Sequence, residues 1–211
     1  MIRNILFDLG GVIITIDPQQ AIRRFEEIGL KNASHHLDSY TQSGYFGDLE
    51  AGKISPEEFR QRLSLEIGHE ITLEDCKYAW TGYVKEVPQR NLELLRKLRS
   101  EGYRLYLLSN TNPFMMSWAE SNEFDGHGHP LRDYFDAEYK SYEIRQMKPD
   151  EMFFRYVLMK ERILPEESLF VDDGPRNVMK ASELYLHTFC PENGHDWTQE
   201  IYKYLSESRP R

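Results

Sequence analysis

The sequence has little that would suit the protein to a membrane or to nucleic acid. Its 211 residues contain no apolar run approaching the ~20 residues that a membrane-spanning helix needs. Its 26 Lys and Arg residues are outnumbered by 35 Asp and Glu residues, which gives a net charge of −9, and no basic stripe gathers the positive side chains. Phosphates of nucleic acids and anionic lipid surfaces are held by clustered positive charge, so we expect neither as a partner.

Cysteine is also scarce. Cys76 and Cys190 form no CxxC pair and have no metal-binding pattern around them, so we expect no disulfide framework and a reduced, cytoplasmic protein. The apolar run Ile2–Phe7 is interrupted by Asp8 and is not followed by a small-residue cleavage site, so we interpret it as a strand and not as a signal peptide. The sequence does not choose between a monomer and a homodimer.

Short apolar runs alternate with helical patterns along most of the chain. This alternation predicts an α/β fold, a Rossmann-like parallel sheet with helices on both faces. The expected strands are Ile2–Phe7, Tyr103–Leu108 and Ser168–Val171, with weaker candidates at Ala137–Tyr139 and Leu186–Phe189. The expected helices are Pro88–Glu101, Asp150–Glu161 and Pro175–Leu184.

Residues 17–87 depart from the alternation, because four helix-start signals follow one another there. These signals are Asp17 before Pro18, Ser34, Ser55 before Pro56, and Thr72. We therefore expect an inserted all-helical domain over 17–87, and a core domain made of 1–16 and 88–211. Such an insertion could cover the carboxyl ends of the strands, where ligands bind in open α/β sheets.

Chemically useful side chains follow the apolar runs. Asp8, Ser109 and the pair Asp172-Asp173 come at the ends of expected strands. Lys148 comes after the expected strand Ala137–Tyr139, from which a loop separates it. Each alone is more often a turn or cap residue. Because strand ends of this kind meet at one edge of a parallel sheet, all of them can converge in one crevice.

Together these groups suit phosphoryl transfer. Asp8 can act as a carboxylate nucleophile. Asp8, Asp173, its neighbour Asp172 and the backbone carbonyl of Gly10 offer the hard oxygen ligands that Mg²⁺ prefers, and Lys148 can neutralise both nucleophile and phosphate. Phosphate binding is expected from Lys148 and from the two loops after the strands. The loop residues assigned to it are Ser109, Asn110, Leu9 and Gly10.

The order of these motifs resembles the haloacid dehalogenase-like (HAD) hydrolase superfamily. Phe7–Ile13 is similar to its first motif, Leu107–Thr111 to its second, Lys148-Pro149 to its third and Phe170–Asp173 to its fourth. The resemblance covers the whole chain. It implies that Asp8 is the nucleophile, and that residues 17–87 are a cap of the C1 type. The first and second motifs look most like those of bacterial sugar-phosphate phosphatases, including enzymes that act on α-D-glucose 1-phosphate.

One position departs from the family pattern. Most phosphatases of the superfamily carry a second Asp two residues after the nucleophile, where it moves protons, and here that position is Gly10. General acid–base help contributes ~10²–10⁴-fold to a rate, so turnover should be slow unless another group substitutes. The substitute could come from the cap or from the loop Glu123–Asp133, and the sequence does not choose between them.

The leading hypothesis is a Mg²⁺-dependent phosphatase that hydrolyses a small phosphorylated metabolite through a phosphoaspartate on Asp8. The alternatives are a metal-free dehalogenase, which the Asp172-Asp173 pair disfavours, and a weakly active phosphate-binding or regulatory protein, which Gly10 favours. No pattern in the cap names the substrate.

Two further segments have competing interpretations. Residues Tyr45–Gly52 either contact substrate or simply connect two cap helices and pack the core of the cap. His127 and His129 resemble a metal-binding pair, but the surrounding glycines and Pro130 are more typical of a flexible loop.

Overall fold

The protein has one parallel sheet at its centre. A computed structural model describes residues 1–37 and 42–207, so residues 38–41 of the expected insertion and 208–211 of the expected core lie outside the described part. Within the described residues, five strands form the sheet in the order β5-β4-β1-β6-β7. They are β1 (Asn4–Phe7), β4 (Arg104–Ser109), β5 (Ala137–Lys140), β6 (Ser168–Val171) and β7 (His187–Phe189). The expected α/β fold is confirmed, and each expected strand is present with ends that shift by no more than a residue or two.

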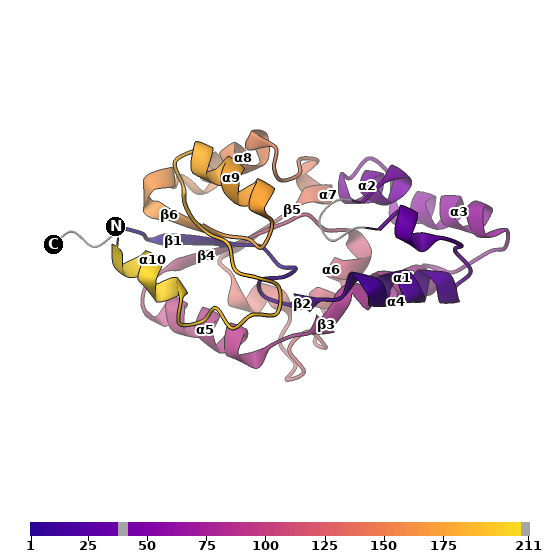
Figure 1. Ribbon diagram of the computed structural model, residues 1–211, viewed down its shortest axis with the longest axis horizontal. Helices are drawn as coiled ribbons and strands as arrows, with labels where there is room; N and C mark the ends of the chain where they lie inside the picture. The colour runs from indigo at the N-terminus through magenta and orange to yellow at the C-terminus, as the bar shows by residue number, and fades with distance from the viewer. Residues whose placement is uncertain (38–41, 208–211) are drawn as a thin grey trace.

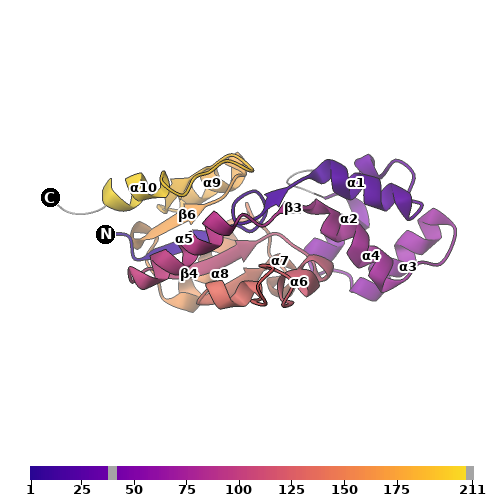
Figure 2. The same cartoon turned by 90° about the horizontal axis from the view of Figure 1, so that it is seen from below.

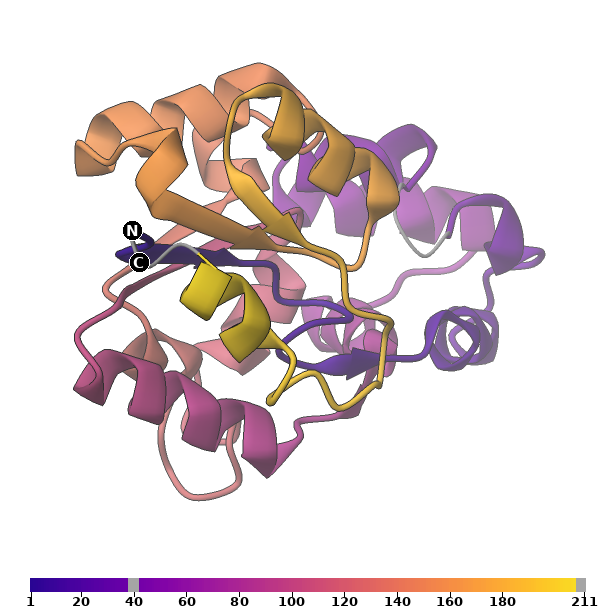
Figure 3. The same ribbon diagram turned by 60° about the vertical axis from the view of Figure 1, so that its left-hand side comes forward.

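Helices cover both faces of the sheet. Figures 1 and 3 show α8 (Glu151–Glu161) and α9 (Pro175–Glu183) on one face, and α5 (Gln89–Ser100) and α10 (Ile201–Glu207) on the other. Successive residues of a strand point to opposite faces, so Leu6 packs with the α8 side while Ile5 and Phe7 pack with the α5 side. Both faces are buried, which explains why the central strands β1, β4 and β6 are mostly apolar and do not alternate with polar residues.

The strand order places the end of β1 at a switch point of the topology. β1 lies in the middle of the sheet and pairs in parallel with β4 on one side and β6 on the other. The chain builds outward from β1 through β4 to β5, and then returns to the other side of β1 with β6 and β7. Crevices for ligands form where connections diverge in this way, just beyond the carboxyl ends of the strands.

Among the described residues, four α-helices lie between β1 and β4, beyond those carboxyl ends (Figures 1 and 2). We call this segment the helical insertion. It contains α1 (Pro18–Glu27), α2 (Gly44–Glu50), α3 (Pro56–Ile67) and α4 (Leu73–Trp80), with short 3₁₀ turns at Ala33–His35 and Thr81–Tyr83. Its interior is aromatic: Phe46 contacts Phe25, Phe59 and Trp80 with ring centroids 4.9–5.5 Å apart.

Three of the four expected helix starts are correct. Asp17, Ser55 and Thr72 each accept hydrogen bonds from backbone N–H groups in the first turn of a helix. Ser34 was expected to start a helix, and this prediction is wrong, because Ser34 lies inside a single 3₁₀ turn that follows Asn32. No side-chain hydrogen bond caps this turn. Serine is a residue type that can cap a helix, but here it does not occupy the position that precedes one.

Several short elements were not expected from the sequence. A two-stranded antiparallel ribbon, β2 (Thr15–Ile16) and β3 (Val84–Glu86), joins the helical insertion to the core. Tyr45–Glu50 belongs to α2 and is not simply a connection. The core also contains α6 (Pro113–Ala119), α7 (Ser141–Ile144) and α10. Each is seven residues or shorter, which is too short to show a clear helical period.

A buried asparagine holds the loop that follows β1. The Asn91 side chain, from α5, donates hydrogen bonds to the carbonyl oxygens of Val12 (3.0 Å) and Ile13 (3.1 Å). The indole nitrogen of Trp197 also donates to Val12 O at 3.0 Å. These bonds satisfy buried carbonyl groups of a loop that lies outside regular structure, and they fix the chain directly after Asp8.

Replacing Asn91 with leucine should therefore destabilise the fold. Asn91→Leu keeps the side chain's approximate volume but leaves the Ile13 carbonyl unsatisfied, and we expect the free energy of unfolding to fall by about 1–3 kcal/mol. Urea denaturation measures the change. Glu93→Leu is the matched control, because Glu93 is exposed on the same helix, and its effect should stay within about 0.5 kcal/mol. Equal effects of the two substitutions would contradict this account.

Candidate active site

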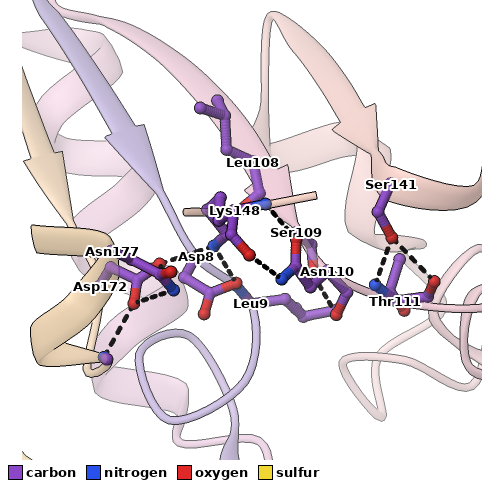
Figure 4. A network of polar contacts seen from close by, with 11 residues as sticks. Asp8, Leu9, Leu108, Ser109, Asn110, Thr111, Ser141, Lys148, Asp172 and Asn177 are labelled. Carbon is purple, nitrogen blue, oxygen red and sulfur yellow. Dashed lines mark hydrogen bonds and ion pairs between the residues drawn. The ribbon is translucent and has the colours of Figure 1, made fainter. Parts of the chain in front are cut away.

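The structure brings the polar groups predicted from the sequence to one place. Asp8 follows β1, Ser109 ends β4 and Asp172 follows β6. The register explains their convergence, since Phe7 pairs with both Leu107 and Val171. Figure 4 shows these side chains together with Lys148, which reaches them from the loop after α7.

Lys148 connects the two central carboxylates. Its ammonium nitrogen lies 2.9 Å from Oδ1 of Asp8 and 2.6 Å from Oδ2 of Asp172, and it donates a third bond of 2.7 Å to the carbonyl oxygen of Leu108. The lysine is only 4% exposed. All three ammonium hydrogens thus have acceptors, which is what allows a charged lysine to be buried.

The side chain of Asn110 positions Lys148 by binding the main chain of the lysine. Its side-chain amide donates to Lys148 O and its side-chain oxygen accepts from Lys148 N–H, both at 2.8 Å. The side chain of Asn110 therefore faces the lysine backbone. The expected role of Asn110 in phosphate binding stays a prediction, and the backbone N–H would have to carry it.

Asp172 and Asp173 have different surroundings, although no pattern in the sequence separates them. Asp172 is completely buried and both its oxygens are engaged: Oδ2 with Lys148, and Oδ1 with the N–H of Gly174 at 2.8 Å. The side-chain amide of Asn177 also donates to both oxygens, at 3.0 and 3.1 Å. Sequence analysis missed Asn177, whose place in the first turn of α9 carries no distinctive pattern.

Asp173 presents its carboxylate to the loop after Asp8. Within residues 1–37 and 42–207 it accepts no hydrogen bond from another residue and has no cationic side chain within ion-pair distance. Gly11 allows this close approach: its φ is +74°, and a Cβ there would lie 2.1 Å from Oδ2 of Asp173. Only glycine fits both the backbone conformation and the space.

The acidic groups have the chemistry of a divalent cation site. In the described part of the chain, one oxygen from each of Asp8, Asp172 and Asp173 can be chosen so that all lie within 4.8 Å of one another. Three carboxylates with a single buried lysine carry an excess of negative charge, and hard oxygen donors at this spacing suit Mg²⁺. Asp173 offers the oxygens least used by the protein, so the residues present fit the metal predicted from the sequence.

The same crowding raises two carboxyl pKa values. Burial raises the pKa of Asp8 to about 7, although the attraction of Lys148 opposes it. Burial, and then the charges of Asp8 and Asp172, raise the pKa of Asp173 to about 8. Burial lowers the pKa of Lys148, but the charges of Asp172 and Asp8 outweigh that effect and hold the pKa above its ordinary value. A bound cation would counter the repulsion that keeps the acids protonated.

A small cavity of about 100 Å³ opens above this cluster. Its walls include the expected phosphate-binding residues, of which Ser109 is 2% exposed. The Leu9 N–H is directed to Asp8, donating to Oδ1 at 2.7 Å. The predicted site residues that line the cavity are Asp8, Leu9, Gly10, Ser109, Asn110, Lys148 and Asp173.

The lining of the cavity also includes residues that were not singled out from the sequence. Glu50 and Trp80 come from the helical insertion, and Asn112 from the start of α6. The Nε1 of Trp80 and the Nδ2 of Asn112 are buried donors that make no hydrogen bond of good geometry within the described residues. Glu50 lies in the segment Tyr45–Gly52, where contact with a substrate was one of two interpretations. Nothing in the sequence distinguishes its carboxyl group from that of Asp48, the other acid of the segment.

The loop with the two histidines lies elsewhere. The carboxylate of Asp125 accepts hydrogen bonds from the backbone N–H groups of His127 (2.7 Å) and His129 (2.9 Å), and from the hydroxyl of Tyr134 (2.7 Å). The loop is organised around this buried aspartate, and it does not line the cavity. Among the described residues, the acidic group at Asp8 is the one cluster with metal-ligand geometry, and no described helix is long and apolar enough to cross a membrane.

Comparisons with known proteins agree with the fold. Residues 2–183 match the family model of haloacid dehalogenase-like hydrolases. A D-ribitol-5-phosphate phosphatase of Bacteroides thetaiotaomicron is 48% identical over 201 residues, which are 95% of this chain and 97% of that protein.

Two solved structures are similar over nearly their whole length. A HAD-like family hydrolase from Porphyromonas gingivalis is 42% identical, with a TM-score of 0.93 and full coverage of both chains. A HAD family enzyme from B. thetaiotaomicron, in complex with magnesium and inorganic phosphate, is 36% identical with a TM-score of 0.87, covering 95% of this chain and all of that one. The protein therefore belongs to the haloacid dehalogenase-like hydrolase family.

Proposed function

We propose that the protein is a Mg²⁺-dependent phosphatase that hydrolyses the phosphate ester of a small metabolite, a sugar phosphate or a sugar-alcohol phosphate. The observation that carries this proposal is the buried lysine between Asp8 and Asp172, beside the open carboxylate of Asp173. Similarity to the D-ribitol-5-phosphate phosphatase supports the substrate class. The small cavity, with the buried N–H of Trp80 in its wall, suits a short, hydroxyl-rich molecule.

In this proposal Asp8 is the nucleophile. Its Oδ attacks phosphorus, the ester bond breaks, and water then hydrolyses the phosphoaspartate. Lys148 offsets the negative charges of nucleophile and phosphate, while Ser109 and backbone N–H groups of the loop donate to phosphate oxygens. Asn110 and Asp172 act through Lys148, which they hold in place.

Asp8, Asp173 and the carbonyl of Gly10 would hold Mg²⁺, with Asp172 close by. The metal would orient the phosphate and reduce the repulsion between it and the carboxylate. We further propose that the helical insertion is a cap domain over 17–87, with the core made of 1–16 and 88–211. A cytoplasmic protein fits the two cysteines, which form no disulfide.

The two alternatives are less well supported. A metal-free dehalogenase attacks carbon and has no use for a cluster of three carboxylates beside its nucleophile. A weakly active phosphate-binding protein was motivated by Gly10 alone, and the relative that is 48% identical is named as a phosphatase.

The nucleophile is tested by Asp8→Asn. The substitution keeps the size of the side chain but removes the attacking carboxylate, so hydrolysis of D-ribitol 5-phosphate and of p-nitrophenyl phosphate should fall to background in a phosphate-release assay with Mg²⁺. Asp48→Asn is the matched control, because Asp48 lies outside the cavity and pairs with Lys53 at the surface. Wild-type activity in Asp8→Asn would refute the assignment.

Metal binding should depend on pH in a defined direction. Folded-state pKa values of about 7 for Asp8 and about 8 for Asp173 lie above the ordinary value of 3.8, so the metal-free protein loses stability as pH rises from about 4 to about 8. Mg²⁺ binds the ionised acids, so its stabilising effect on Tm should grow from about pH 6 to about pH 9. Thermal unfolding with Mg²⁺ or EDTA measures it. A Mg²⁺ effect that shrinks over this range would be inconsistent with the proposed ligands.

Two neighbouring glycines provide a matched pair. Gly11→Ala places a methyl group 2.1 Å from the Asp173 carboxylate and strains a φ of +74°, so the carboxylate must move and Mg²⁺ affinity should fall at least tenfold. Gly10→Ala puts its Cβ 3.5 Å from Ile16, an ordinary contact, and should leave Mg²⁺ affinity within about twofold. Calorimetric titration compares them. Equal affinities would show that Asp173 is not a ligand.

A further inference from the structure

The ester oxygen of an alkyl phosphate must receive a proton as it leaves, and Gly10 has no side chain that could supply this proton. Among the cavity-lining residues of the described chain, Glu50 is the one carboxyl outside the acidic cluster at Asp8. We propose that Glu50, at the end of α2, is the proton donor and acceptor of the reaction. This inference rests on the phosphatase function proposed above.

Glu50 is held in a fixed place relative to the core. Its backbone oxygen accepts a 2.7 Å hydrogen bond from the hydroxyl of Ser141, whose oxygen also accepts from the N–H of Thr111 at 3.0 Å. Ser141 therefore connects the end of α2 to the loop that follows β4. Figure 4 shows the part of this connection that joins Ser141 to Thr111. The backbone of Glu50 is thus hydrogen-bonded to the rest of the protein through Ser141.

A second contact tightens the same junction. Gly52 has a φ of +66°, and a Cβ there would lie 2.1 Å from the backbone oxygen of Tyr142. The backbone of the insertion thus approaches α7 as closely as only glycine permits. A proton donor needs such rigid placement, since displacements near 1 Å weaken catalysis strongly.

The surroundings of the Glu50 side chain suit proton transfer. It is 6% exposed, and within the described residues no lysine or arginine forms an ion pair with it. Burial raises its pKa to about 8; the side-chain amide of Asn112 opposes this rise, and the charge of Asp8 adds to it. A carboxyl group in such an environment carries a proton near neutral pH and can also release it.

The direction of the reaction fits this placement. In-line transfer puts the leaving oxygen on the side of phosphorus opposite to Asp8. Asp8 lies at the strand ends, and Glu50 belongs to the helices beyond them (Figure 1). A substrate between the two presents its ester oxygen toward the insertion that carries Glu50.

The steps balance as follows. Asp8 Oδ forms a bond to phosphorus while the P–O ester bond breaks, and the ester oxygen takes the electron pair together with the proton of Glu50, leaving as an alcohol. In the second step water attacks phosphorus and gives its proton to the Glu50 carboxylate. The bond between phosphorus and Asp8 breaks, its electrons return to Asp8, and Glu50 is again protonated.

The test compares two leaving groups in Glu50→Gln. An alkyl alcohol needs a proton donor in order to leave, whereas p-nitrophenolate is stable enough to leave without one. We compare kcat/KM values because kcat/KM includes only the steps up to phosphorylation of Asp8, in which the leaving group departs. We expect kcat/KM for D-ribitol 5-phosphate to fall by about 10²–10⁴-fold. For p-nitrophenyl phosphate it should change by less than about fivefold. Glu50→Asp, which keeps a carboxyl, should recover part of the loss.

The pH dependence of kcat/KM for the two esters distinguishes the Glu50 carboxyl from the other titratable groups. Other titratable residues line the same cavity, namely Asp8, Tyr83, Lys148 and Asp173, but their ionisation acts on both substrates. The ratio of the two kcat/KM values should therefore fall above about pH 8 in the wild type and be flat in Glu50→Gln. Asp48→Asn, on the same helix but outside the cavity, should behave as the wild type in both assays.

The assays distinguish a failure of the proposed phosphatase function from a failure of the role proposed for Glu50. If wild-type protein with Mg²⁺ hydrolyses neither ester, the phosphatase function is wrong and this inference falls with it. If the wild type hydrolyses both esters and Glu50→Gln leaves both unchanged, or lowers both equally without recovery in Glu50→Asp, the phosphatase stands and Glu50 is not the proton donor. Wild-type hydrolysis of the aryl ester alone would also overturn the inference, since the protein would then lack a working donor.

Discussion

The site depends on one buried ammonium group that three acceptors share. Lys148 contacts Asp8, Asp172 and the Leu108 carbonyl, each belonging to or directly following one of the central strands. A buried charge is tolerated only when it is paired and fully hydrogen-bonded. The lysine can therefore occupy this place only while β1, β4 and β6 are in register, so the sheet and the site require each other.

The excess of negative charge around that lysine gives the site its chemistry. Asp172 is engaged by the lysine and by the start of α9, which leaves Asp8 and Asp173 oriented toward the cavity. One cation for three acids leaves the cluster anionic, which a Mg²⁺ ion would offset and an anionic phosphate alone would worsen. An acidic chain can thus accommodate an anionic substrate if Mg²⁺ joins Lys148 at this point, because the two cations together offset the carboxylates.

The sequence was sufficient for those features that depend on contiguous residues. Apolar runs identified the central strands, and polar residues directly after them identified Asp8, Ser109 and Asp172-Asp173. Asp17, Ser55 and Thr72 identified helix starts because each pairs with backbone N–H groups two or three residues away. The prediction for Ser34 was wrong because a cap signal is local, and Ser34 lies inside the 3₁₀ turn Ala33–His35 and not before a helix.

The features that the sequence could not supply arise from contacts between distant segments. Asn110 faces the backbone of Lys148, and Asn177 reaches Asp172 across the start of α9; neither has a pattern that separates it from an ordinary polar residue. Nothing in the sequence separates Glu50 from the other 34 acids, and only the fold shows that it is buried and lines the same cavity as Asp8. The difference between Asp172 and Asp173 also appears only when Gly11 is seen against the second of them.

The central claim is that Asp8 attacks phosphorus beside a metal held by Asp173. The most direct measurement is a crystal structure of the protein with Mg²⁺ and beryllium trifluoride, which imitates a phosphoryl group bonded to a carboxylate. This account predicts beryllium bonded to an oxygen of Asp8, Mg²⁺ coordinated by Asp8 and Asp173, and the Lys148 ammonium still between Asp8 and Asp172. An anion that occupies the cavity without a bond to Asp8, or a metal held away from Asp173, would contradict it.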